Sequence, residues 1–285
     1  MLNASSFVAI IGAGDLGGAL AHKLAGLDRV GRILLIDEER GIAAGKALDI
    51  QQAASVEGFR TRLEATADLT AAAGAAAVVF ADEARPDPAR PADACLARLA
   101  RLATLDRNAV FVCAGASHVE LMERAIGEGR IPRARIVGAA PLAFEAAVRA
   151  LVAAATDRSP AQVALSVAGR PPEFVILWSG ATVGGSPVEQ AVGPAVLARI
   201  RRRVPALWPP GPNALASAAA RVAAAVAAGS RRLFLCSVGL DHPPAARGRV
   251  AAMPVELGPQ GIIRIVPPVM SAREQTLVEN ALDIF

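Results

Sequence analysis

The residues best suited to chemistry form a glycine-rich loop near the start of the chain, with an acid beyond it. The loop reads Gly12, Ala13, Gly14, Asp15, Leu16, Gly17, and the acid, Asp37, lies twenty residues after Gly17. Such glycines permit a tight turn and the close approach of a pyrophosphate, and a carboxylate at that distance can accept both ribose hydroxyls. The pattern predicts a dinucleotide site made of Gly12, Gly14, Asp15, Leu16, Gly17 and Asp37. The alternative is a glycine turn in some other α/β protein.

The elements around the loop have the order that such a site needs. The apolar run from Phe7 to Ile11 predicts a strand buried on both faces, as in a parallel sheet. Leucines then recur at helical spacing, so we expect a helix whose N-terminal amides face a bound phosphate. A second apolar run ends at Asp37, and two more acids follow it, Glu38 and Glu39. These acids would repel a 2′-phosphate, which favours NAD over NADP despite the adjacent Arg40.

The rest of the chain continues the alternation of strands and helices. Further strands are expected at residues 60–65, 75–81, 109–113 and 135–138, with helices at 45–53 and 92–105. This rhythm predicts an α/β fold with a Rossmann-type doubly wound parallel sheet. Beyond residue 140 the pattern changes to an α+β second domain, so we expect domains at 1–140 and 141–285. The later elements expected are strands at 162–168, 173–178, 232–238, 251–257 and 262–266, helices at 142–155, 213–228 and 271–282, and a surface loop at 205–212.

Composition narrows the class of protein. Hydrophobic residues make up 53% of the 285 residues, which suits a globular chain with a real core. No apolar run is long enough to cross a membrane, no secretory signal is recognised, and the three cysteines lack metal-ligand spacing, so we expect a cytoplasmic protein without a metal site. The net charge of +4 includes an arginine patch without interleaved aromatics. We interpret that patch as a solvated face rather than a nucleic-acid site.

Several motifs, in the right order along almost the whole chain, resemble the lactate/malate dehydrogenase family. They are the glycine loop, the segment ending at Asp37, residues 47–53 (ALDIQQA), residues 178–185 (WSGATVGG) and residues 253–258 (MPVELG). The resemblance implies an NAD-binding first domain, a second domain that supplies substrate groups, and hydride transfer between nicotinamide and a small 2-hydroxy acid. It also implies that the helix around residues 48–53 lies at a subunit interface, in a homodimer or homotetramer.

The catalytic groups that the family uses are absent from their usual positions. The family's histidine lies in a segment that here reads Gly169-Arg170-Pro171-Pro172-Glu173-Phe174, so Pro171 replaces it. The partner aspartate and the carboxylate-gripping arginine fall on Phe144 and Ala147. Losing acid–base help costs roughly 10²- to 10⁴-fold in rate, and a bidentate arginine is not readily replaced. The resemblance therefore implies a family member with a degraded catalytic site.

Two smaller departures lie at the ends of strands. The family's Asn-Pro after the fifth strand is replaced by residues 115–118, which end in His118. The small Ala-Gly pair that normally ends the fourth strand against the cofactor is replaced by Ala81 and Asp82. The loop that follows keeps two arginines, Arg85 and Arg90, near the family's loop arginines.

Arg85, Arg90 and His118 are therefore the remaining catalytic candidates. His118 follows the carboxyl end of a strand, where ligands approach an open α/β sheet, but an ordinary surface histidine at a helix start is the favoured alternative. Two hypotheses remain: a diverged NAD-dependent oxidoreductase with rearranged groups, and a silent relative that serves as a nucleotide sensor or interaction scaffold. Arg85 or Arg90 converging with His118 or Glu173 would favour the first hypothesis. A pocket filled by Phe144, Pro171 and Phe174 would favour the second.

Overall fold

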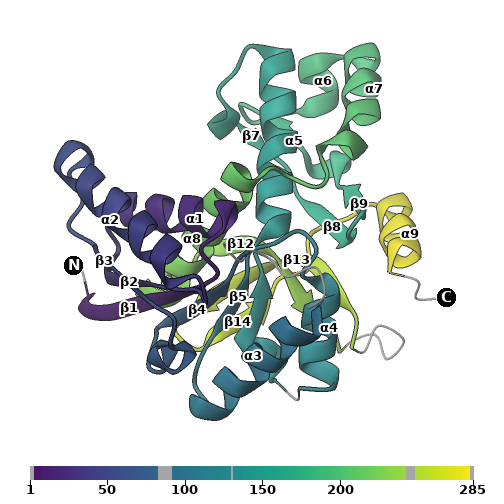
Figure 1. The fold of residues 1–285 in the computed structure, drawn as a ribbon. Coiled ribbons are helices and arrows are strands. Elements are labelled where there is room, and N and C mark those ends of the chain that lie inside the picture. The colour runs from purple at the N-terminus through teal and green to yellow at the C-terminus, as the bar shows by residue number, and fades with distance from the viewer. Residues whose placement is uncertain (1–2, 83–91, 130, 242–247, 283–285) are drawn as a thin grey trace.

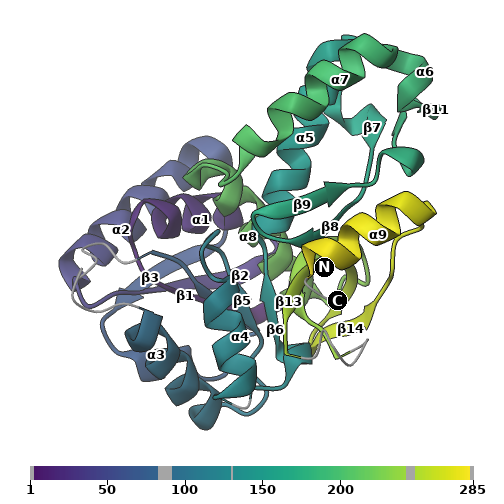
Figure 2. The same ribbon diagram turned by 90° about the vertical axis from the view of Figure 1, so that its right-hand side faces the viewer.

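A computed structural model describes residues 3–82, 92–129, 131–241 and 248–282. A long sheet runs through the molecule with helices on both faces, and a group of shorter elements projects from it (Figures 1 and 2). The main helices are α1 (Asp15–Gly26), α2 (Arg40–Glu57), α3 (Ala92–Leu105), α4 (Val119–Gly127), α5 (Ala140–Thr156), α6 (Val188–Val192), α7 (Pro194–Arg203), α8 (Pro212–Ala228) and α9 (Ala272–Ala281).

The first half of the chain forms the parallel part of the sheet. Its strands follow the spatial order β3-β2-β1-β4-β5-β6, and every neighbouring pair is parallel. The order reverses at β1, as in a doubly wound sheet, so the predicted α/β fold is confirmed. The strands are β1 (Asn3–Ile11), β2 (Val30–Ile36), β3 (Arg62–Thr66), β4 (Ala77–Phe80), β5 (Phe111–Cys113) and β6 (Ile136–Gly138).

The second half adds antiparallel strands to the same sheet instead of forming a separate one. β12 joins β6 where Ser237 pairs with Gly138, and β13, β8 and β9 follow in that order, with β14 on β13. A small sheet of β11, β10 and β7 stands apart. The strands are β7 (Val163–Ala164), β8 (Val167–Arg170), β9 (Glu173–Ile176), β10 (Thr182–Val183), β11 (Ser186–Pro187), β12 (Leu233–Gly239), β13 (Val250–Gly258) and β14 (Gly261–Ile265).

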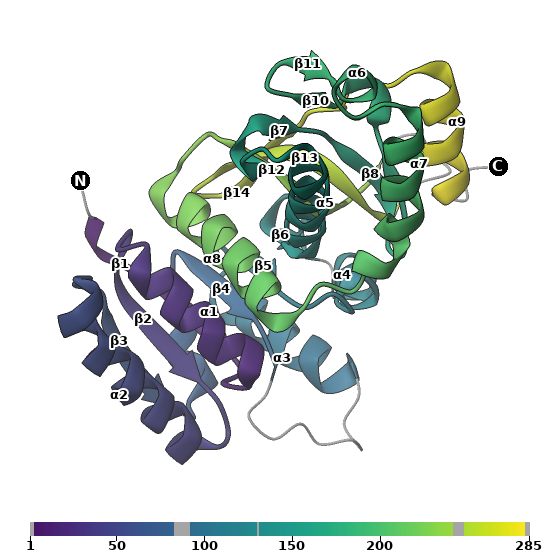
Figure 3. The same cartoon turned by 90° about the horizontal axis from the view of Figure 1, so that it is seen from above.

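The side chains of β1, the strand that leads into the glycine loop, point alternately to the two faces of the sheet. Val8 and Ile10 belong to the apolar cluster that α1 and α8 share, whereas Ala9 and Ile11 belong to the cluster under α3 and α4. A strand buried on both faces reads as a continuous apolar run, which is why residues 7–11 carry no alternation. α8, from the second half of the chain, lies beside α1 (Figure 3). α1, which begins at the glycine loop, thus packs against both the sheet and α8.

Two sequence predictions need correction. The single strand expected at residues 162–168 is two strands in different sheets, because β7 pairs with β10 while β8 pairs with β13 and β9. The segment at 205–212 is not simply a surface loop. It begins within a 3₁₀ turn (Val204–Leu207), Pro210 is buried, and Trp208 packs against the apolar clusters. An indole buries more apolar area than most side chains, and this outweighed the turn signal of the prolines.

A third apolar cluster lies under the projecting elements. Phe144, Val148 and Val152 follow one another at four-residue spacing along α5 and face Leu235 of β12 and Ile200 of α7. Among the described residues, no helix is both long enough and apolar enough to cross a membrane.

Candidate functional site

The glycine loop has the tight geometry that its sequence predicts. Gly12 has φ +102°, and a Cβ there would lie 2.2 Å from the backbone oxygen of Asp82. A Cβ on Gly17 would lie 2.1 Å from the carbonyl oxygen of Gly12. Real Cβ atoms do not approach backbone so closely, so both positions require glycine. The loop therefore packs directly against the first turn of α1 and the end of β4.

Asp37 lies at the end of β2, as predicted, and its carboxylate is held by the backbone. It is 6% exposed. Its Oδ2 accepts a hydrogen bond of 2.7 Å from the amide of Ala13, and its Oδ1 accepts one of 2.9 Å from the amide of Glu39. These two bonds fix a carboxylate beside the glycine loop, where the sequence predicts the contact with ribose. A carboxylate has about four acceptor positions, so ribose hydroxyls are compatible with both bonds.

Asp82 has a role that the sequence analysis missed. Its carboxylate lies at the N-terminus of α1, where Oδ2 accepts from the amide of Leu16 at 3.1 Å and Oδ1 from the amide of Gly17 at 2.8 Å. Its carbonyl oxygen accepts from Gly14 at 2.9 Å. The N-cap residue of α1 is Gly14, which has no side chain to satisfy these donors. The signal was present in the sequence, since an acid stands where the family has a small residue.

Lys46, on α2, closes the loop from the other side. Its Nζ donates to the carbonyl oxygen of Gly14 at 2.6 Å. A Cβ on Gly18 would lie 3.0 Å from the Lys46 side chain, so the two segments are in close contact. An ammonium group therefore stands at the mouth of the loop, and it offsets part of the negative charge of the nearby acids.

The shape of the loop suits a dinucleotide, but backbone amides that would bind its pyrophosphate already donate to other groups of the protein. The tight turn that Gly12 and Gly17 permit and the position of Asp37 suit NAD. A pyrophosphate binds such a loop through the amides at the start of α1, and two of these already donate to Asp82. The residues present therefore do not accept a pyrophosphate while the Asp82 carboxylate occupies this position.

His118 precedes α4 at its N-cap, at the carboxyl edge of the sheet. The amide of Gly115 donates to its Nδ1 at 3.2 Å, so Nδ1 is an acceptor and the proton of the neutral ring is assigned to Nε2. Burial lowers the pKa of His118 to about 4, although the charge of Asp82 opposes the shift. The imidazole is neutral at pH 7. It turns inward against Gly115 rather than lying as a solvated side chain.

The positions that the resemblance assigns to the family's aspartate and arginine hold the apolar residues Phe144 and Ala147. Phe144 is 2% exposed and stacks on Phe174, with ring centroids 4.5 Å apart. Trp208 packs edge-on against both rings, at 6.0 Å from Phe144 and 4.9 Å from Phe174. Ala147 follows one turn along α5 and carries no polar group. This aromatic cluster (Phe144, Phe174 and Trp208) occupies the position for which the sequence left two alternatives, a new polar site or an apolar filling without catalytic groups.

Among the described residues, no contact joins Arg170 or Glu173 to His118. Pro171 lies in the short turn between β8 and β9, where the family's histidine position falls. Its neighbour Arg170 is committed to Glu123 of α4, with bonds of 2.9 and 3.2 Å, and Glu173 is exposed. Arg85 and Arg90 lie outside the described residues.

The buried thiols and possible metal ligands offer no alternative chemistry. Cys113 is fully buried in β5, and burial raises the pKa of its thiol, which makes it a poor nucleophile. Within the described ranges, no group of three or more histidine, cysteine or acidic side chains could hold a metal ion.

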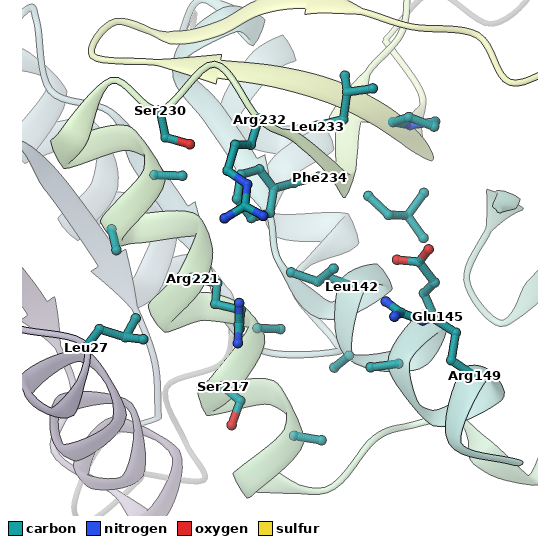
Figure 4. A pocket seen from close by; sticks show the side chains of 18 of the residues that line it. Leu27, Leu142, Glu145, Arg149, Ser217, Arg221, Ser230, Arg232, Leu233 and Phe234 are labelled. Carbon is teal, nitrogen blue, oxygen red and sulfur yellow. The ribbon is translucent and has the colours of Figure 1, made fainter. Parts of the chain in front are cut away.

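A cleft of about 960 Å³ opens elsewhere, between α5 and α8 (Figure 4). Glu145 and Arg149 reach it from α5, Arg221 points into it from α8, and Arg232 points into it from the position just before β12. Burial raises the pKa of Glu145 to about 7, and the charge of Arg149 opposes this shift. The charged groups Glu145 and Arg149, which lie near Phe144 on α5, thus line the cleft and not the aromatic cluster, because neighbouring positions on a helix point in different directions.

Comparisons with known proteins agree with the fold. No family model matches the chain. A malate dehydrogenase (Malate dehydrogenase 2) of Rhodopseudomonas palustris is 31% identical over 292 residues, which cover 94% of this chain and 91% of that protein. A malate dehydrogenase of Roseiflexus is 26% identical, over 97% of this chain and 95% of the relative.

Solved structures are similar over nearly the whole chain. The malate dehydrogenase of Salinibacter ruber has a TM-score of 0.87 at 22% identity, covering 97% of this chain and 94% of that one. A lactate dehydrogenase of Cryptosporidium parvum, complexed with lactic acid and nicotinamide adenine dinucleotide, has a TM-score of 0.84 at 21% identity, covering 98% and 95%. The identity to the Rhodopseudomonas protein over this coverage shows the family: the chain belongs to the lactate/malate dehydrogenase family.

Proposed function

We propose that this protein binds NAD(H) but has lost ordinary malate or lactate turnover, and that it acts as a nucleotide sensor or scaffold. The observation that carries the proposal is the aromatic cluster at Phe144. Catalysis in this family requires a proton donor at the reacting oxygen and an arginine that grips the carboxylate. An apolar cluster supplies neither, and it also disfavours the burial of a charged substrate.

Retention of the loop supports the binding half of the proposal. Gly12 and Gly17 keep positions where only glycine fits, and Asp37 is fixed at the end of β2. The cofactor proposed is NAD rather than NADP, because Asp37, Glu38 and Glu39 together disfavour a 2′-phosphate.

The second candidate is an NAD-dependent oxidoreductase that acts on a more apolar 2-hydroxy or 2-oxo acid with other groups. His118 favours it, since a neutral imidazole at the carboxyl edge of the sheet can take part in proton transfer. In this candidate Arg85 or Arg90 would contact the substrate. Oxidation of NADH with a branched or aromatic 2-oxo acid, lost in His118→Gln, would favour it over the silent protein.

We also propose that the protein forms a homodimer or homotetramer through α2. Two large apolar side chains on this helix face solvent, with Leu48 60% and Val56 89% exposed. Their burial against a second copy would remove apolar surface from water. Sedimentation of the purified protein measures the mass of the assembly.

The binding proposal is tested by calorimetric titration with NADH, with NADPH as the competing nucleotide. We expect heat from NADH at millimolar concentration or below and weaker binding of NADPH. Gly14→Val is the matched variant: Gly14 has φ −68°, which a side chain tolerates, so the variant should fold while its side chain blocks the approach of a ligand. Heat that is equal in Gly14→Val, or missing from the wild-type protein at millimolar NADH, would contradict the proposal.

A further inference from the structure

The carboxylate of Asp82 binds amides at the N-terminus of α1 to which a pyrophosphate would otherwise bind. Its carboxylate accepts from the amides of Leu16 and Gly17, which are separated from it by 66 and 65 positions in the sequence. A carboxylate bound to two amides at a helix N-terminus offers the same contacts as a phosphate oxygen pair.

Most amide donors of the glycine loop are in fact already used within the protein. Those of Gly12, Ala13, Gly14, Leu16 and Gly17 donate to Ile36, Asp37 and Asp82 at 2.7 to 3.1 Å. A pyrophosphate therefore cannot bind by simple addition. It must displace Asp82 from the helix, and the displaced carboxylate then repels it because both are anions.

We propose that Asp82 is a specificity-determining residue that competes internally with the pyrophosphate and so weakens dinucleotide binding. This inference rests on the proposed function, since it concerns the same site. The contact selects against ligands that carry phosphate at this point, and it does not act against a nucleoside, whose ribose would contact Asp37. The wild-type protein then binds dinucleotides only at high dinucleotide concentrations.

The role of the Asp82 carboxylate can be tested apart from the stability of the fold, because backbone bonds hold this segment in place. Its carbonyl oxygen accepts from Gly14 whatever the side chain is, and Ala81 donates to Ile11. A change of the side chain alone therefore leaves β4 attached to the loop. The amides of Leu16 and Gly17 become available when the carboxylate is removed.

The test compares NADH and adenosine binding to Asp82→Gly, Asp82→Asn and the wild-type protein. We expect NADH to bind Asp82→Gly at least tenfold more tightly than the wild-type protein, and Asp82→Asn to lie between them. Adenosine has no phosphate, so its affinity should change less than twofold. Asp157→Asn is the charge-matched control: Asp157 is exposed at the far end of α5 in the left-handed conformation, which asparagine tolerates.

Amide hydrogen exchange gives an independent readout. Without nucleotide, the amides of Leu16 and Gly17 should exchange faster in Asp82→Gly than in the wild-type protein, and NADH should restore their protection. Unchanged exchange in both Asp82 variants would overturn the inference, and Asp82→Asn provides this result even where Asp82→Gly does not fold.

The outcomes also separate the inference from the proposed function. Equal NADH affinity of the wild-type protein and Asp82→Gly would overturn the role of Asp82 and leave NAD binding intact. Binding to Asp82→Gly alone would support that role and contradict NAD binding by the wild-type protein. Absence of binding to all variants would overturn both.

Discussion

The variant Phe144→Asp is expected to be less stable than the wild-type protein by about 4 kcal/mol or more, and to gain no malate turnover. Phe144 is 2% exposed and touches both Phe174 and Trp208. Truncation of a buried phenylalanine alone costs about 3–5 kcal/mol, and burial of an unpaired carboxylate adds to this cost. The aspartate that the family uses at this position therefore cannot simply be restored.

Urea denaturation of Phe144→Asp and Phe144→Leu measures this effect. Leucine keeps the position apolar, so Phe144→Leu should lose only about 1–2 kcal/mol. A Phe144→Asp protein with the stability of Phe144→Leu would mean that the position is open to water. Measurable malate oxidation by that variant would mean that the rest of a catalytic site is still present.

The second large effect is expected at Glu274, which attaches α9 to the rest of the molecule. Its carboxylate accepts from the amide of Ser179 and the amide of Ser271, both at 2.9 Å, and completes a capping box with Ser271. Burial opposes its ionisation, but the hydrogen bonds from Ser179 and Ser271 prevail and lower its pKa to about 2.

Glu274 should therefore make stability depend on acid pH. Because its pKa is lower in the folded state than the ordinary value of about 4.5, its contribution is complete above pH 4.5 and is lost as the pH falls toward 2. The shift corresponds to about 3 kcal/mol at 1.36 kcal/mol per pKa unit. Glu274→Gln should lower stability at pH 7 and flatten this acid dependence.

Glu279→Gln provides the control on the same helix, since the only bond described for the Glu279 side chain is the one from Gln275. An exposed pair of this kind contributes about 0.5 kcal/mol or less. Thermal unfolding between pH 2.5 and pH 7 distinguishes the variants. Equal acid dependence in the wild-type protein and Glu274→Gln would show that this carboxylate does not stabilise the fold.

Local sequence patterns predicted the first half of the fold well. The apolar run at residues 7–11, the glycines and the recurring leucines each depend on contacts close in sequence or on burial of one strand, and their positions agree with β1 and α1. The helix expected at 92–105 also coincides with α3. Apart from residues 162–168 and the short strands β10 and β11, the later strands were placed to within a few residues, because their apolar runs are bounded by local turn signals.

The site itself depends on contacts that no local pattern contains. Asp82 is placed at α1 by the pairing of β4 with β1, and Trp208 reaches Phe144 only because its segment folds back over α5. The sequence identified Phe144 and Asp82 as unusual residues for their positions. It could not tell that one joins an aromatic cluster and the other satisfies the donors of a helix 66 residues away.

The loss of ordinary turnover is tested most directly by NADH oxidation with oxaloacetate and with pyruvate, followed by absorbance. The malate dehydrogenase of Salinibacter ruber serves as the positive control. We expect a rate at least about 10⁴-fold below a typical enzyme turnover of about 10 per second, because Pro171 and Ala147 stand where the resemblance places the acid–base group and the carboxylate-gripping arginine. Turnover above about 1 per second with either acid would contradict the proposed silence and show that other residues perform the reaction.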